Sequence, residues 1–124
     1  MNREEVMALT DEGLRLTAAE LMGWEQHVFG NWPLQMQPPD KPEIDGIPQV
    51  MDCPDYPNDI AAAWELLDAV PVEMHINVSR SPANDGWDIQ IFTLTGHEFI
   101  VATDDLSVAR AITCAFILAM ENIG

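Results

Sequence analysis

The run AITCAFILAM, residues 111–120, constrains the fold of this chain more than any other feature. It contains no charged residue and is about half of the roughly 20 residues that a helix needs to cross a bilayer, so it predicts a buried helix. We expect this helix to begin at Asp104 or Asp105, whose carboxylates suit a helix start, and to end near Asn122. Because its apolar residues extend nearly all round, it needs cover beyond one sheet face, and dimerisation is one source of that cover.

The net charge restricts the partners of this chain. It carries 5 lysines and arginines against 21 aspartates and glutamates, which gives a formal net charge of -16. Such a charge repels phosphate backbones and anionic membrane surfaces, so we expect neither direct nucleic-acid binding nor membrane binding. The acidity either maintains solubility or forms a contact surface for a basic partner.

The length and the cysteines indicate a single cytoplasmic domain. At 124 residues the chain buries enough surface to fold without a disulfide or a metal, so residues 1–124 are expected to form one domain. Cys53 and Cys114 lack the close spacing of a metal or redox motif and are typical of reduced thiols. The N-terminal residues MNREEVMALTDEG contain no apolar stretch typical of a secretion signal, which favours the cytoplasm.

A first helix is predicted from Thr10 to Gly23. Thr10 suits the cap of this helix, and the acidic residues after it suit the positive end of the helix dipole. Leu14 and Ala18 recur at helical spacing and predict one inward face. Gly23 fits the left-handed turn that ends helices, and Trp24 is expected to fold back onto the last turn.

Residues 25–57 form a proline-rich excursion from this pattern. Seven of the 9 prolines fall there, and no sustained periodicity is present. Prolines fix extended geometry and reduce the entropy of the unfolded chain. Because Trp32, Met36, Ile44 and Ile47 lie among them, we expect this irregular segment to pack against the domain rather than to be disordered.

A second helix is predicted in the stretch DCPDYPNDIAAAWELLDAV, residues 52–70. Asn58 and Asp59 suit its first turn, and Pro71 ends it. Its apolar face is made of Ile60, Ala63, Trp64, Leu67 and Val70. This spacing predicts that Trp64 anchors the core and that Trp64→Ala lowers the free energy of unfolding by about 3–5 kcal/mol.

Three strands are predicted at residues 72–79, 87–95 and 97–103. The first alternates between apolar and polar residues, which is typical of a half-buried strand. The second has apolar residues on both faces, which predicts a central strand. Turn signals at residues 84–86 and 95–97 are short, so the strands are expected to be antiparallel neighbours.

Three segments carry a resemblance to a known family: LMGW at residues 21–24, YPNDIAAAWE at 56–65 and ARAITCAFILA at 109–119. With these segments the chain resembles the phage ABA-sandwich domain family, small proteins of phages and prophages. The resemblance implies an α+β fold, namely an alpha-beta-alpha sandwich with an antiparallel sheet of three or more strands in the order α-loop-α-β-β-β-α. It also implies a phage or prophage origin and carries over no catalytic residue. The expected location is the cytoplasm of a bacterial host cell.

The chain departs from the family pattern in two places. Pro57 and Asn58 stand where the family usually has small hydroxyl residues after the tyrosine. The loop after the MGW sequence is also longer than in the family. No contact made by this region is therefore carried over from the resemblance.

No motif in the chain predicts catalysis. His27, His75 and His97 form no HxxxH pair and lie beside no cysteine at ligand spacing, so we expect no metal site and no cofactor. No serine stands in a nucleophile elbow, and no glycine-rich phosphate loop is present. An enzyme is the least favoured class, and no catalytic residue is assigned.

Aromatic and basic side chains are the candidates for ligand binding. An arginine pairs bidentately with a phosphate, and an aromatic ring stacks on a base. The candidates are Arg80, Arg110, Trp32, Tyr56, Trp87 and His97. Packing in the core or at an interface is the alternative role of Trp87, and neutralisation of the acidic surface is that of Arg110.

Two functional classes remain open. The first is a counter-defence binding protein of a phage or prophage, in which a homo-oligomer sequesters a small nucleotide signal. The second is an acidic inhibitor that mimics nucleic acid and binds a basic host protein in a salt-sensitive way. A structural or interaction domain is a further alternative.

Overall fold

The computed structural model of this chain describes residues 2–26, 35–40, 44–47, 49–71, 74–81, 86–93, 99–105 and 107–123. In these ranges the helices are α1 (Arg3–Met7), α2 (Asp11–Leu21), α3 (Ile60–Ala69) and α4 (Val108–Ile123). The strands are β1 (Glu25–Gln26), β2 (Gln35–Gln37), β3 (Met51–Asp52), β4 (Met74–Ser81), β5 (Gly86–Thr93) and β6 (Phe99–Asp105). The predicted α+β class with antiparallel strands is confirmed, whereas α1 and the short strands β1 to β3 were not predicted.

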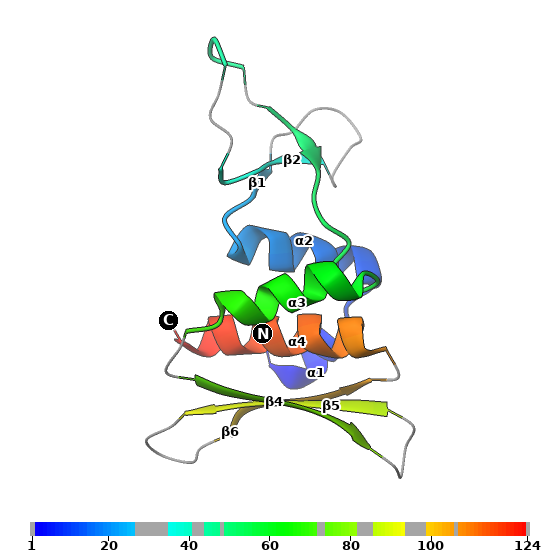
Figure 1. The fold of residues 1–124 in the computed structure, drawn as a ribbon. Coiled ribbons are helices and arrows are strands. Elements are labelled where there is room, and N and C mark those ends of the chain that lie inside the picture. Colours follow the sequence, from blue (N-terminus) through cyan, green and yellow to red (C-terminus); the bar gives the residue numbers. More distant parts are fainter. Residues whose placement is uncertain are drawn as a thin grey trace.

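The layers of the molecule differ from the expected sandwich. Strands β4, β5 and β6 form an antiparallel sheet with β5 in the centre, as predicted. Figure 1 shows every described helix on one side of this sheet, with the small β1-β2-β3 sheet beyond α2. His75 and Asn77 on the opposite face of β4 are exposed. An alpha-beta-alpha sandwich, with a helical layer on each face of the sheet, is therefore not what the described residues form.

Helix α4 lies at the centre of these layers. Its residues 109–119 are almost all fully buried, as the sequence predicted. The sheet strands β5 and β6 contact it on one side, and α1, α2 and α3 contact it from the others (Figure 1). The cover that this apolar helix needs thus comes from the same chain, so its burial does not call for dimerisation.

The start of α4 corrects one expectation. Asp104 and Asp105 belong to β6 and do not begin the helix. The Ser107 side chain accepts a hydrogen bond from the Arg110 backbone N–H at 3.3 Å instead, and the Ser107 carbonyl accepts from the N–H of Ala111 at 3.0 Å. The helix begins later because residues 104 and 105 pair with β5 and are thereby held in extended geometry.

Helix α2 agrees with its prediction. The Thr10 hydroxyl accepts from the Gly13 N–H at 3.1 Å, which caps the helix. Gly23 has a φ of 97°, the left-handed geometry that favours glycine. The Trp24 N–H then donates to the Ala19 carbonyl at 3.0 Å, so the chain folds back onto the last turn.

Helix α3 shows that the prediction for Trp64 was wrong. Asp59 caps the helix through hydrogen bonds from the N–H groups of Ala61 and Ala62, and the helix ends before Pro71 as expected. Its buried residues are Ala62, Ala63, Leu66 and Leu67. Trp64 is 50% exposed, because the buried face is rotated toward residues 62 and 66, which leaves position 64 at its margin.

The described residues of the excursion at 25–57 pack in part against the domain. Strands β1 to β3 form a small antiparallel sheet within the excursion, and Met36 is fully buried. Ile44 and Ile47 pair across a tight turn whose central residues, Asp45 and Gly46, both have positive φ, and both isoleucines are exposed. The expectation that the apolar residues of this segment pack inward therefore holds for Met36 but not for this turn.

The sheet confirms the predicted alternation in β4. Met74, Ile76 and Val78 pack against the core, whereas His75 and Asn77 face solvent. Both predicted turns, at residues 84–86 and 95–97, lie at least partly outside the described residues. In the described part of the chain, no helix has the length and hydropathy needed to span a membrane.

The difference between Phe116 and Trp64 gives a test of these positions. Phe116 is fully buried in α4, so we expect Phe116→Ala to lower the free energy of unfolding by about 3–5 kcal/mol. Trp64→Ala is expected to cost only about 1–2 kcal/mol, because half of the indole surface already lies in water. Urea unfolding measures both values, and an equal loss in the two variants would contradict the exposed position of Trp64.

Candidate functional site

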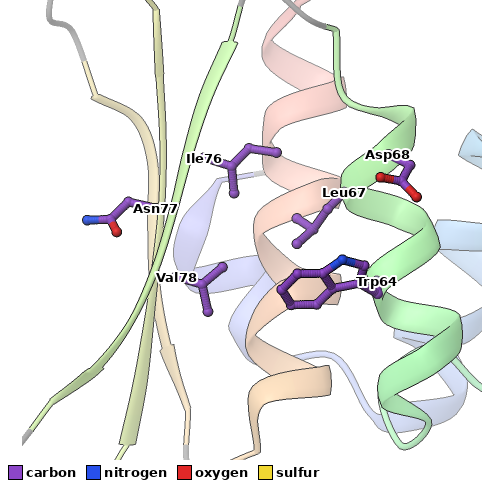
Figure 2. Close-up of a pocket in the computed structure, with 6 residues that line it drawn as sticks. All are labelled: Trp64, Leu67, Asp68, Ile76, Asn77 and Val78. Atoms are coloured by element: carbon purple, nitrogen blue, oxygen red, sulfur yellow. The ribbon is translucent and has the colours of Figure 1, made fainter.

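A groove lies between α3 and β4 because the core is incomplete there. Helix α4 packs over β5 and β6, while β4 forms the edge of the sheet. Trp64 and Leu67 of α3 face the inward side of β4 across this space (Figure 2). The resulting groove has a volume of about 480 Å³ and is open to solvent. Its lining residues are Trp64, Leu67, Asp68, Ile76, Asn77 and Val78.

The walls of the groove are apolar. Figure 2 shows Trp64 and Leu67 extending from α3 toward Ile76 and Val78 of β4, whereas Asn77 points to the other side of the strand. The four apolar side chains are only partly covered, except for Leu67, which is buried. Asp68 supplies a carboxylate at the rim on the side of α3. The groove therefore suits an apolar or aromatic group that is flanked by polar atoms.

Two predicted site residues meet where β4 continues beyond the groove. Arg80 follows Val78 by two residues, so its side chain leaves the same face of the strand, about 7 Å further along. The sheet register places Arg80 directly opposite Trp87 of β5. Directly opposed residues of antiparallel strands project to the same face with Cβ atoms about 4.5–5.5 Å apart. A guanidinium and an indole are thus neighbours beside an apolar groove.

The surroundings of this pair allow the Arg80 guanidinium to bind a ligand. Arg80 is exposed and forms no hydrogen bond or ion pair within the described ranges of the chain, and Trp87 is partly buried. An arginine beside an indole is attracted to the ring face and keeps its outward N–H groups for another partner. Arg80 and Trp87 are therefore the two sequence candidates that the structure brings together.

Arg110 is engaged in the fold. Its guanidinium donates to the Asp11 carboxylate at 2.5 Å and to the carbonyls of Met7 and Leu9 at 3.2 and 2.8 Å. These bonds join the first turn of α4 to the segment between α1 and α2. A ligand at Arg110 would have to share the guanidinium with these contacts, and binding at this residue stays a prediction.

Tyr56 is also enclosed by the fold. Its side chain is only 1% exposed. Burial raises the pKa of Tyr56 to about 12, the nearby Cys53 and Glu65 add to the rise, and a hydrogen bond with the Trp24 side chain opposes it. Because the ring is covered, Tyr56 offers no surface for stacking in this structure, and a ligand there would require the site to open.

Cys53 is the buried thiol next to this tyrosine. Burial raises the pKa of Cys53, although the adjacent Arg15 guanidinium counteracts part of the rise. Arg15 donates to the Cys53 backbone carbonyl, with the Nε atom at 2.9 Å. A thiol that is buried and kept neutral is a poor nucleophile, so this cluster holds the excursion against α2 rather than forming a reactive site.

Two further predicted site residues, Trp32 and His97, lie outside the described residues.

Trp64 lines the groove but was not predicted as a site residue, because the apolar spacing assigned it to the core. One signal was present: residues 60, 64 and 68 share a helix stripe, and this stripe ends in Asp68, which is typical of a margin rather than of a core face. Among the described residues, no three histidine, cysteine or acidic side chains gather as a metal site.

Comparisons with known proteins give one likeness in fold. A scan against protein-family models and a search of curated proteins return no match. A crystal structure of a phage protein from Bacillus cereus ATCC 14579 is similar, with a TM-score of 0.55 and 17% sequence identity. The match covers 97% of this chain and 92% of that one. At this identity the likeness establishes a shared fold, whereas the ABA-sandwich family is not confirmed.

Tyr56 is the single tyrosine of the chain, so its titration can be read directly. We expect tyrosinate absorbance to rise with a midpoint near pH 12 in the folded protein and near the ordinary value of about 10 in denaturant. The unfolded chain then loses the proton first as the pH rises. Neutral Tyr56 therefore makes its full contribution to the free energy of unfolding below about pH 10. About 2–3 kcal/mol of that free energy is lost as the pH approaches 12. A midpoint near 10 before unfolding would show that the ring is accessible.

Proposed function

We propose that this chain is a phage or prophage binding protein that sequesters a small nucleotide signal of a host defence system. The observation that carries the proposal is the pairing of Arg80 with Trp87 beside the apolar groove that contains Trp64. A guanidinium binds a phosphate bidentately, and an indole or an apolar wall receives a base. The fold shared with a Bacillus cereus phage protein supports the phage setting.

The net charge limits the size of such a ligand. At -16 the chain repels a polyanion at long range, so a nucleic acid is disfavoured. A mononucleotide or a small cyclic nucleotide carries few charges and contacts Arg80 locally. We therefore propose a ligand of that size and no enzymatic reaction.

Retained ligand is the first test of this proposal. Native mass spectrometry of protein purified from bacteria with an active nucleotide-signalling defence system is expected to show a nucleotide-sized adduct that heating removes. The same spectrum counts the copies in the assembly, which tests the homo-oligomer expected from the sequence. A wild-type protein without an adduct that also binds no cyclic or linear nucleotide at micromolar concentrations would contradict sequestration.

Substitution of Arg80 tests where the nucleotide binds. Arg80→Lys keeps the charge but removes the planar fork, so we expect nucleotide affinity to fall about tenfold or more in calorimetric titration. Ser79→Ala is the control, because Ser79 is next to Arg80 on the same strand but on the opposite face and outside the groove lining. Equal affinities for wild type and Arg80→Lys would place the nucleotide elsewhere.

Binding to a basic host protein is the second candidate function. It is supported by the net charge of -16 and by the acidic side chains on α3, the helix that lines the groove. Residues 59–68 include Asp59, Glu65 and Asp68 but no lysine or arginine. An acidic surface of this kind attracts a basic partner and sets the rate and specificity of its association.

Salt dependence tests this second candidate. A basic host protein is first captured with this chain and purified. We expect its affinity for the chain to fall steeply as the salt concentration rises from about 0.1 to 1 M, because this rise shortens the screening length from about 10 to about 3 Å. The measurement is a binding titration at several salt concentrations. Affinity that does not change with salt would rule out an electrostatic contact as the source of binding.

A further inference from the structure

Strand β4 has an open edge. It pairs with β5 on one side, and no described strand pairs with its other side. The Met74 N–H donates to the Pro71 carbonyl at 3.0 Å. No described strand pairs with the other backbone N–H and C=O groups on that side, and pairing of such groups with another extended chain is the chemistry of β-strand addition. This strand is described over eight residues, Met74–Ser81, which is long enough to hold a partner strand in register.

The groove lies against the inward face of the same strand. Ile76 and Val78 are two residues apart on that face, and Trp64 and Leu67 of α3 stand across from them (Figure 2). A strand that adds to β4 presents every second side chain to this face. Apolar side chains at alternate positions of the added strand would therefore enter the groove and complete the core that α4 leaves open.

Charge selects the kind of strand that fits. Asp68 lines the groove, Glu65 is exposed on the same helix, and the whole chain carries -16. A second copy of this chain would bring a further -16 to the same edge. A segment with basic side chains between its apolar ones meets complementary charge, because alternation turns the basic side chains to the outer face of the sheet, where Asp88 of β5 lies directly opposite Ser79 of β4.

We propose that the open edge of β4 and the α3–β4 groove bind an extended segment of a basic protein in which apolar and basic residues alternate. The inference rests on the second candidate function and names the segment that such a partner presents. The bound segment adds a strand beside β4 and places its apolar side chains against Trp64, Ile76 and Val78.

A peptide that alternates lysine with valine is the probe for this site. In a strand, successive N–H groups point to opposite edges, so strand addition uses only every second N–H of the peptide. Methylation of one alternate set of peptide nitrogens is expected to abolish binding in fluorescence anisotropy, and methylation of the other set is expected to leave it. Loss with both sets, or with neither, would overturn strand addition.

Two substitutions on α3 test the groove. Trp64→Ala removes a groove wall and is expected to weaken peptide binding about tenfold or more. Ile60→Ala is the matched control, because Ile60 is 47% exposed on the same helix, close to the 50% of Trp64, yet lies outside the groove lining. Equal effects of the two substitutions would overturn the proposed position.

The outcomes separate this inference from the function on which it rests. If a basic host protein binds with steep salt dependence but its affinity is unchanged by Trp64→Ala, the second candidate function stands and this site is wrong. If no basic protein or peptide binds, both fail. If the protein alone forms a dimer that Trp64→Ala disrupts, a second copy occupies the groove, and the proposed partner is overturned.

Discussion

Burial of α4 on all sides is the constraint on which the rest of the structure depends. Its residues 109–119 have almost no contact with water, because the sheet and the other described helices pack around them. The sheet covers one side, and α2 and α3 cover the other. The bonds from Arg110 to Asp11, Met7 and Leu9 then fix the direction of α4 relative to the N-terminal helices, because a guanidinium satisfies several acceptors at once.

The candidate site is a consequence of how this central helix is covered. A single helix spans only about 10 Å with its side chains, and among the described elements α4 makes its main strand contacts with β5 and β6 rather than with β4. Trp64 and Leu67 reach toward the inward face of β4 from α3 but do not fill the space. The groove and the open strand edge thus arise together, at the one edge of the sheet formed by β4.

The net charge of the chain and the local charge at Arg80 favour different ligands for this site. The overall charge of -16 disfavours long polyanions and favours basic proteins. At the end of the groove, however, Arg80 lies beside Trp87, and its guanidinium bonds to no other residue in the described part of the chain. A small anion and a basic extended segment are therefore both compatible with the site, and they would contact different parts of it: the anion Arg80, and the segment the groove and the strand edge.

The sequence by itself determined the elements whose signal is local. The Thr10 cap, the turn at Gly23, the alternation in β4 and the buried character of residues 109–119 follow from hydrogen bonding and periodicity within short segments. Tertiary structure decided what depends on distant partners. The side of the sheet that the helices cover, the exposure of Trp64 and the engagement of Arg110 are set by contacts far apart in the chain, and helical spacing cannot reveal which way a face is rotated. The pairing of Arg80 with Trp87 likewise required the register of two strands, because the residue types that form a site are local but their proximity is not.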